Sequence, residues 1–560
     1  EIIMKLRNII YSALAVSALT LTSCSDSYLD EKMYSSYGTD VTDVESKIIG
    51  LHQKFADLWG WSDQQGFVGC FQDGTDVGAP GSTQGVEVPF YQYGSLNAEN
   101  SGVSKLWTSL YSIINSANII INTENVDAAA KGEAEFFRAY AYNLLVTLWG
   151  PVPLLTESKA EPRTDFIRNA VSEIDAVIFA DLNDAIANLP EVGKTKTQNR
   201  INKDCARILA GEAFNRMGKF AEAQAAVSAT INSGNYKLIS ERYGKFLSDA
   251  GDYYSDMFRW GNQRRSQGNT EGIWVFQMEY NRDVTGGIIN APQQRRNWVA
   301  AFHKLTDFMQ NADSLGGRGN GRLRLSNYVK YGIWEDGDIR NSNHNIRRIL
   351  YANKPNVNKE ISVKDGFRVD DGTSGATKIT IKTGDRIYWK TSDTLEVMYP
   401  HPTKWGAYDP TDDFGWEMVK DWPLMRFAEA YLLRAEARIN QGNTAGAAED
   451  INVLRDRAFK TYRAETGNAN AGKVTAAQMT IDFLLDERIR EMVGEENRRY
   501  TLCRTGKLAE RVKMMMDKWA EGTDSKKITG FDASKHTLLP IPLSEIQLNK
   551  DADLQQNPGY

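Results

Sequence analysis

The sequence predicts a mostly α-helical protein in which helical hairpin repeats hold a large irregular insertion. Three observations support this prediction: an amphipathic hairpin over residues 421–458, a similar hairpin over 208–231, and a stretch over 243–420 with almost no helical periodicity. A helical hairpin buries its apolar face against neighbouring hairpins, so repeated hairpins predict one packed array.

The hairpin over 421–458 has two amphipathic patterns separated by Gln441-Gly442-Asn443. Pro423 stands where a helix tolerates proline in its first turn, so we expect the first helix to begin there. Apolar residues recur at helical spacing on both sides of Gly442, and the alanines among them let two helices approach closely, as in tetratricopeptide-like repeats. We therefore expect polar substitutions at Leu432 or Leu454 to unfold the protein.

Helical periodicity also defines an N-terminal helical part over 41–242 and a C-terminal part over 421–560. A loop over 60–102, rich in Gly, Asn, Gln and aromatic residues, is longer than a connection needs, which is typical of a functional loop. The C-terminal part is expected to finish in a proline-interrupted tail that wraps over the scaffold. The further helices that we expect cover residues 41–59, 103–122, 133–149, 170–188, 481–493 and 514–519.

The irregular insertion over 243–420 holds seven of the 13 tryptophans. Alternating patterns predict a short strand over 271–280 and a hairpin of strands 378–382 and 386–390, joined through Thr383-Gly384-Asp385. The insertion is therefore expected to differ in kind from the helical parts that flank it.

The first residues are expected to be a targeting segment rather than part of the fold. Lys5 and Arg7 precede a short apolar run that ends in Leu21-Thr22-Ser23-Cys24, the layout of a bacterial lipoprotein signal. We predict a signal peptide over 1–23, lipidation of Cys24 and a tether over 24–40, so that acyl chains attach the protein to a membrane without a spanning helix.

Composition excludes several classes of protein. A net charge of -6 without a long basic run disfavours nucleic acid as a partner. The 5 histidines are scattered, and the HExxH and GxSxG motifs of metalloproteases and serine hydrolases are absent, so we predict no catalytic residues, no metal and no cofactor. Cys70, Cys205 and Cys503 show no paired spacing and are interpreted as buried or free thiols, with a chance disulfide left open.

Two charged stretches have simple interpretations. The acidic loop over 409–417 offers oxygen atoms to calcium but departs from EF-hand spacing, which favours a solvated loop. The charges over 486–499 are interpreted as i,i+4 ion pairs on helix surfaces, each worth little.

Several segments together resemble the SusD/RagB family of Bacteroidetes outer-membrane lipoproteins. The resemblance covers essentially the whole chain, with its motifs in the family's order. They are the Cys24 lipobox with Tyr28-Leu29-Asp30; Phe137-Arg138-Ala139-Tyr140 through Trp149-Gly150-Pro151; Asp338-x-Arg340; Pro423 through Glu429; Asn452-x-x-Arg455-x-Arg457-Ala458; Glu487-Arg488 through Tyr500; and Leu539-Pro540 through Tyr560.

The resemblance implies a non-enzymatic cell-surface lipoprotein of the outer membrane that binds oligosaccharides and delivers them to a SusC-like TonB-dependent transporter. It also implies a scaffold of tetratricopeptide-like hairpins and an aromatic platform for ligand on irregular segments. Aromatic rings stack on the C–H faces of sugars while polar side chains bind the hydroxyl groups. By position in the two irregular segments, the expected ligand-binding residues are Trp61, Asp76, Tyr91, Tyr93, Asn97, Arg296, Trp298 and Trp334.

The sequence is also compatible with three other functions. The alternatives are a peptide-binding member of the same family, a surface-anchored glycoside hydrolase whose paired carboxylates spacing does not reveal, and a helical scaffold that binds only proteins. Neither the glycan nor its linkage can be read from the sequence. For Trp298→Ala, we expect weaker glycan binding with nearly unchanged thermal melting.

Overall fold

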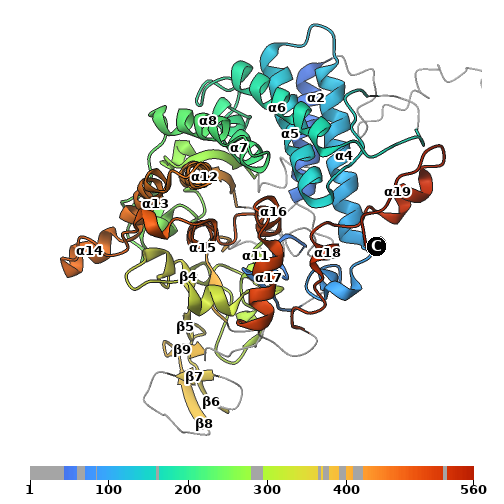
Figure 1. Cartoon of the computed structure of the whole chain (residues 1–560). Helices are drawn as coiled ribbons and strands as arrows, with labels where there is room; N and C mark the ends of the chain where they lie inside the picture. The colour runs from blue at the N-terminus through green and yellow to red at the C-terminus, as the bar shows by residue number, and fades with distance from the viewer. Residues whose placement is uncertain are drawn as a thin grey trace, which may run out of the picture.

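The computed structural model describes residues 43–59, 70–82, 85–158, 163–278, 294–362, 367–369, 378–389, 399–407, 420–520 and 526–560. The predicted signal peptide and tether, Cys24, Trp61 and the acidic loop over 409–417 lie outside these residues. The prediction of a mostly α-helical fold is confirmed: helices form the upper body of the molecule, and the insertion lies below them (Figure 1).

The helices before the insertion pack on one another in chain order. Asn100, Asp127 and Asn202 cap three of them by accepting hydrogen bonds from backbone N–H groups of the first turn. Because Asp127 is such a cap, α5 begins about one turn earlier than its apolar pattern predicts. These helices are α2 (Val44–Trp59), α4 (Ser101–Ile121), α5 (Ala128–Trp149), α6 (Val171–Asn188), α7 (Lys203–Arg216) and α8 (Phe220–Asn232).

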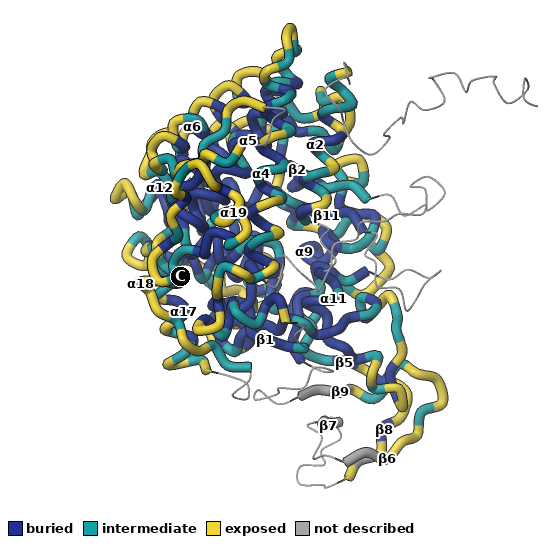
Figure 2. Tube along the Cα trace, turned by 90° about the vertical axis from the view of Figure 1, so that its right-hand side faces the viewer, coloured by how far each residue is buried: buried dark blue, intermediate teal, exposed yellow. Residues whose placement is uncertain are grey.

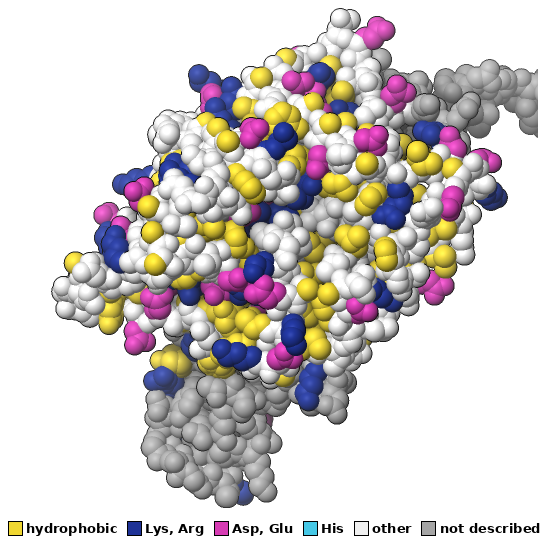
Figure 3. All heavy atoms as spheres, in the orientation of Figure 1, with side chains coloured by type: hydrophobic (Ala, Val, Ile, Leu, Met, Phe, Trp, Pro, Cys, Tyr) yellow, Lys and Arg dark blue, Asp and Glu magenta, His cyan; other side chains and the backbone are white. Residues whose placement is uncertain are grey.

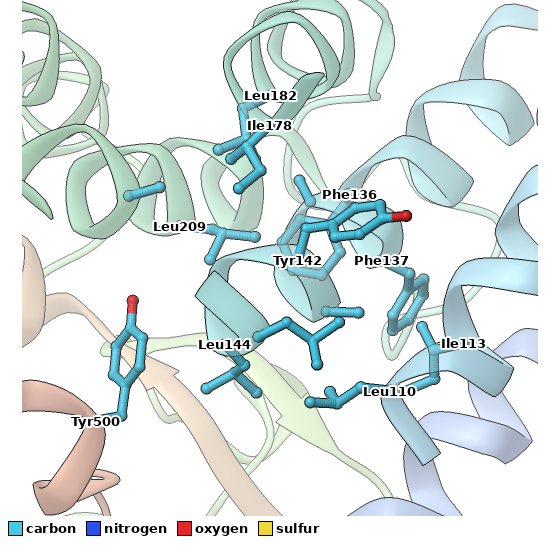
Figure 4. Packing of buried hydrophobic residues seen from close by; sticks show 14 of the residues in the cluster. Leu110, Ile113, Phe136, Phe137, Tyr142, Leu144, Ile178, Leu182, Leu209 and Tyr500 are labelled. Atoms are coloured by element: carbon cyan, nitrogen blue, oxygen red, sulfur yellow. The ribbon is translucent and has the colours of Figure 1, made fainter. Parts of the chain in front are cut away.

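The main hydrophobic core lies between these helices. Figure 4 shows side chains of α4, α5, α6 and α7 converging on one region, and Figure 2 shows that the buried residues fill the middle of the helical body. The labelled members include Leu110, Phe136, Phe137, Ile178 and Leu209, all buried. One continuous core therefore joins the N-terminal helices.

The hairpins on the two sides of the insertion form a single array. Helix α12 (Phe427–Asn440) packs on its partner α13 (Thr444–Ala458) and also on α7 and α8. Gly211 of α7 lies at this contact: a Cβ atom there would be 2.4 Å from Val227 Cγ1 of α8 and 3.4 Å from Leu433 Cδ1 of α12. Glycine thus allows three helices to approach at this point, and the repeat prediction is confirmed.

The remaining C-terminal helices lie beside this array, and the tail returns to the N-terminal part. The Leu539 backbone N–H donates to the Leu148 carbonyl, and Trp149 Nε1 donates to the Pro540 carbonyl at 2.8 Å, so the tail wraps over the end of α5 as predicted. These helices are α14 (Lys460–Thr466), α15 (Ile481–Met492), α16 (Arg498–Arg504), α17 (Leu508–Asp517), α18 (Ala533–His536) and α19 (Leu543–Leu548).

The described part of the insertion consists of short helices and of strands in two- or three-stranded antiparallel sheets, which β1 of the first loop and β11 of the C-terminal part also join. Strand β1 (Gly78–Pro80) pairs with β3 (Leu323–Leu325), and β4 (Ile346–Arg347) pairs with β10 (His401–Pro402). The other strands are β2 (Gly272–Phe276), β5 (Ile349–Tyr351), β6 (Asn358–Ser362), β7 (Phe367–Val369), β8 (Lys378–Lys382), β9 (Arg386–Trp389) and β11 (Trp422–Arg426); the short helices include α9 (Tyr253–Asp256) and α11 (Gln294–Trp298).

Two sequence-based predictions about strands and helix starts are wrong in detail. Residues 422–426 form β11, which pairs with β2, so α12 begins at Phe427 and Pro423 lies in a strand. The side chains of Trp422 and Met425 are buried there, and this burial outweighs the helical pattern. Likewise α17 begins at Leu508 rather than Met514.

The predicted hairpin of β8 and β9 does not form either. Strand β8 pairs with β6, and β9 pairs with β5 and β7, so residues 378–389 run alongside 349–362 as one interrupted strand. The Gly384 N–H donates to the Ala352 carbonyl and the Ala352 N–H donates to the Asp385 carbonyl, so the Thr383-Gly384-Asp385 segment continues the ladder and does not reverse the chain. These strands project from the body as an arm (Figures 1 and 2).

The charges of α15 form a buried network, which corrects the prediction of surface ion pairs. Glu491 lies 2.5 Å from Arg457 and 3.2 Å from both Arg426 and Arg340, and all four side chains are buried. Glu487 lies 2.8 Å from Arg340, which also pairs with Asp338 at 2.7 Å. Partners distant in the sequence replace the expected i,i+4 neighbours, because α15 runs between the insertion and the helical array. Further members are Glu271, Arg455 and Arg490.

The three cysteines described, Cys70, Cys205 and Cys503, are free thiols, as predicted. Burial raises the pKa of all three, that of Cys503 to about 11. Their thiolate forms are therefore scarce at neutral pH.

Leu454 offers a test of the helical array. It is fully buried between α12 and α13, whereas its neighbour Val453 is 37% exposed on the same helix. We expect Leu454→Ala to cost about 2–5 kcal/mol through lost burial and a cavity, and Val453→Ala to change stability by less than about 0.5 kcal/mol. Thermal denaturation of both variants measures this difference, and equal melting temperatures would contradict the packing.

The pH dependence of the protein's stability tests the buried charge of Glu496. Its carboxylate lies 2.6 Å from Arg488 Nε and 2.8 Å from Arg498 Nη1. Burial alone would raise the pKa of Glu496, but the two guanidinium groups outweigh burial and lower this pKa from 4.5 to about 2. The ionised carboxylate therefore stabilises the fold above about pH 4.5, and this contribution is lost as the pH falls towards about 2.

We accordingly expect Glu496→Gln to lower the melting temperature at pH 7, and the difference from the unmodified protein to shrink between about pH 5 and about pH 3. Glu449→Gln, at an exposed position of α13, is the matched control and should melt like the unmodified protein at each pH. A difference for Glu496→Gln that stays constant with pH would contradict this assignment.

Candidate functional site

The structure brings part of the first loop and part of the insertion together at the β1–β3 sheet, near Asp76 and Trp298. Ser326, just after β3, donates its backbone N–H to the Val77 carbonyl and its hydroxyl to the Asp76 carbonyl at 2.6 Å. Trp298 packs in the same cluster as Val77 and Leu323, and Trp334 packs against that cluster. Two irregular segments more than 200 residues apart therefore share one core.

Most of these residues face the interior of the protein. The Asp76 carboxylate accepts hydrogen bonds from Arg498 Nε and Nη2, both at 2.7 Å, and is fully buried. The Tyr93 hydroxyl donates to the Gly74 carbonyl and accepts from Arg499 Nη1, each at 2.9 Å. Tyr91 and Trp298 are also buried. In this structure the four side chains offer no ring face or carboxylate to solvent, so any part in ligand binding would be indirect.

The burial of Trp298 reverses the expectation for the thermal stability of the Trp298→Ala variant. A fully buried tryptophan that packs against Val77, Leu323 and Trp405 stabilises the core, and its truncation costs about 3–5 kcal/mol. Trp298→Ala would therefore lower the melting temperature, which corrects the expectation of unchanged melting.

The other predicted residues are nearer to solvent. Asn97 is exposed, and its side-chain oxygen accepts the backbone N–H of Glu99 at 2.9 Å, which forms a turn. Trp334 is partly exposed, with Nε1 donating to the Val329 carbonyl at 2.6 Å. Arg296 is partly exposed, and burial together with Arg318 and Arg322 lowers its pKa to about 10. The ligand-binding role of these three residues, and of Trp61, stays a prediction.

The described part of the insertion also forms a cavity of about 530 Å³ that is open to solvent. We call it the insertion cavity. Its walls come from residues 246–260, 313–316, 343–353 and 401–406. Gly316 and Gly406 bring two of these walls into contact: a Cβ atom on Gly316 would lie 3.0 Å from the Gly406 Cα atom. Cavities of several hundred Å³ are the size at which proteins bind small ligands.

Aromatic and polar side chains line the insertion cavity together. Phe246, Trp260 and Tyr351 supply rings, and the Tyr351 side chain is 51% exposed. The Arg259 guanidinium lies 3.8 Å from the centre of the Phe246 ring and 2.8 Å from the Asp249 carboxylate. Rings beside fixed hydrogen-bonding groups are the combination that binds sugars.

Short strands and turns fix the polar groups of this cavity. Arg347 in β4 pairs in register with His401 in β10, and its Nη1 donates to the Ser314 carbonyl at 2.5 Å. The Asn343 side-chain oxygen accepts the backbone N–H groups of Arg348 and Ile349, which holds the turn before β5. Burial lowers the pKa of His401 to about 3, with Arg347 contributing, so this imidazole is neutral at pH 7.

Sequence reasoning located the insertion but missed this cavity. Trp260 belongs to the tryptophan-rich segment that signalled function, whereas Phe246, Arg347 and Tyr351 lie in separate turns and strands with no common spacing. Only the tertiary arrangement of β4, β5 and β10 places them around one space.

Within the described ranges, no group of three or more His, Cys, Asp or Glu residues is placed to hold a metal ion. In the same ranges, no helix combines the length and the apolar character needed to cross a membrane.

Family models match both parts of the chain. A model described as "SusD family" matches residues 320–560, and one described as "Starch-binding associating with outer membrane" matches residues 27–210. A SusD-like protein of Formosa agariphila is 24% identical over 100% of both chains. The starch-binding protein SusD of Bacteroides thetaiotaomicron is 38% identical over 140 residues, which are 25% of this chain and 22% of that protein.

A solved structure supports the same relationship at the level of the fold. The crystal structure of a SusD homologue from Bacteroides thetaiotaomicron superposes with a TM-score of 0.68 at 18% identity, and the match covers 92% of this chain and 96% of that one. With both terminal regions matched by models of one family and the fold shared along nearly the whole chain, the protein belongs to the SusD family.

Proposed function

We propose that this protein binds glycans at the cell surface and performs no covalent chemistry on them. Membership in the SusD family is the observation that carries this proposal, since one matching model is described as starch-binding and one relative is named a starch-binding protein. The aromatic and polar lining of the insertion cavity supports it, because the same surface can stack on sugar rings and bind their hydroxyl groups.

We propose that lipid at Cys24 holds the protein on the outer membrane and that it passes oligosaccharides to a SusC-like TonB-dependent transporter. The association with the outer membrane in the description of the N-terminal model supports the location, and the lipobox motif ending at Cys24 supports the anchor. Trp61, Asn97, Arg296 and Trp334 remain proposed ligand contacts, in addition to the residues that line the insertion cavity.

Isothermal titration calorimetry with a panel of neutral and acidic polysaccharides tests glycan binding. Binding of at least one glycan without release of reducing sugar supports the proposal. Binding of peptides with no binding to any glycan would overturn it, as would hydrolysis of the bound glycan.

Two variants test the insertion cavity as the binding site. We expect Trp260→Ala and Tyr351→Ala each to weaken binding of the recognised glycan about tenfold, or ~1.4 kcal/mol, because each removes a ring from the cavity. Tyr351→Ala should melt close to the unmodified protein, since its ring is half exposed.

Phe166→Ala is the matched control, because Phe166 is a partly exposed aromatic residue outside the cavity. It should bind like the unmodified protein. Unchanged affinity in both cavity variants would place the site elsewhere on the molecule.

A further inference from the structure

We propose that the insertion cavity selects a negatively charged glycan, with Arg347 holding a carboxylate or sulfate group of a sugar unit. This inference rests on the proposed glycan-binding function and names the substrate class of that site. It follows from the way in which the charges around the cavity are paired.

Arg347 lines the cavity and has no anionic partner in the part of the chain that the structure describes. One terminal nitrogen, Nη1, donates to the Ser314 carbonyl, and Nε is buried without a hydrogen-bond partner. Among the residues that the structure describes, Arg347 forms no ion pair with a carboxylate, and its charged neighbour is a second cation, Arg259. The buried arginines around α15 differ from Arg347, because each of them pairs with a glutamate of that helix.

The free-energy cost of burying the Arg347 guanidinium without a carboxylate indicates that a ligand binds it. Burial, with Arg259 contributing, lowers the pKa of Arg347 to about 10, so the guanidinium is still charged at neutral pH. An unmade hydrogen bond at a buried donor costs about 1–3 kcal/mol, and more for a charged group. An oxyanion in the cavity would give the guanidinium the counter-charge that it lacks, and a charge-assisted hydrogen bond to it would offset part of this cost.

The other charged groups of the cavity do not neutralise Arg347. Asp249 pairs with Arg259, and Asp313 is exposed to solvent, where its charge is screened. His401, opposite Arg347 in the strand pair, is buried and neutral. The exposed His344 also lines the cavity.

The space beside Arg347 suits a sugar rather than a free ion. Trp260, Phe246 and Tyr351 line the same cavity of about 530 Å³, so a ring could stack there while its acidic group reaches Arg347. Surface charge does not provide an alternative on the face drawn in Figure 3, where acidic and basic side chains are interspersed.

Two matched pairs of ligands test the inference on the unmodified protein. One pair is an oligogalacturonide and its methyl ester, in which a small methyl group replaces the charge of each carboxylate, and the other is a sulfated galactan oligosaccharide and its desulfated product. We expect at least one acidic probe to bind about tenfold more tightly than its uncharged counterpart, with an advantage that decreases as salt is added. A preference in only one pair identifies the group as carboxylate or sulfate.

Arg347→Gln should remove this preference and leave binding of the uncharged probe within about twofold. Arg265→Gln, an exposed arginine of the same insertion outside the cavity, is the matched control and should keep the preference. Equal affinity for charged and uncharged probes in the unmodified protein would overturn the inference, whether or not the variant folds. Binding of uncharged probes alone would leave the glycan-binding function standing, whereas failure to bind any glycan would overturn that function itself.

Discussion

The buried ion pairs around Glu487 and Glu491 are the interaction on which the arrangement of the whole chain depends. These two carboxylates of α15 face Arg340 from the insertion, Arg426 from β11, and Arg455 and Arg457 from α13. Burial alone would raise the pKa of both glutamates, but the surrounding arginines lower it, so both stay ionised at neutral pH. Loss of one partner of a buried pair costs about 3–5 kcal/mol, because the remaining charge is left without compensation. The network therefore fixes how the insertion sits on the helical array.

This dependence explains why the family motifs lie where they do. Asp338-x-Arg340, Arg455-x-Arg457 and Glu487-Arg488 belong to the resemblance by sequence, and in the structure they are members of the network or its neighbours. The shared motifs thus describe how the scaffold holds the insertion. The insertion cavity is lined by other residues, among them Trp260, Arg347 and Tyr351. A family that keeps its scaffold and changes its cavity can bind different ligands with one fold.

The helical array was predictable from sequence, and the insertion was predictable only in outline. The periodicity around Leu432 and Leu454 predicts helices because both residues repeat on an apolar face, and both are buried. The same reasoning fails at Trp422 and Met425, where pairing with β2 outweighs the helical pattern. Periodicity does not reveal partners distant in sequence, such as Arg340 for Glu487 or β6 for β8. For the same reason aromatic content pointed to Trp298, which is a core residue, and not to Tyr351, which borders the cavity.

Hydrogen–deuterium exchange of an Arg340→Met variant is the most direct test of the central claim that the buried network positions the insertion. The variant leaves Asp338, Glu487 and Glu491 without one of their partners. The account predicts faster exchange in the cavity walls at 343–353 and 401–406, with little change in α4, α5 and α6. Unchanged exchange in those walls, or an equal increase over the whole chain, would contradict it.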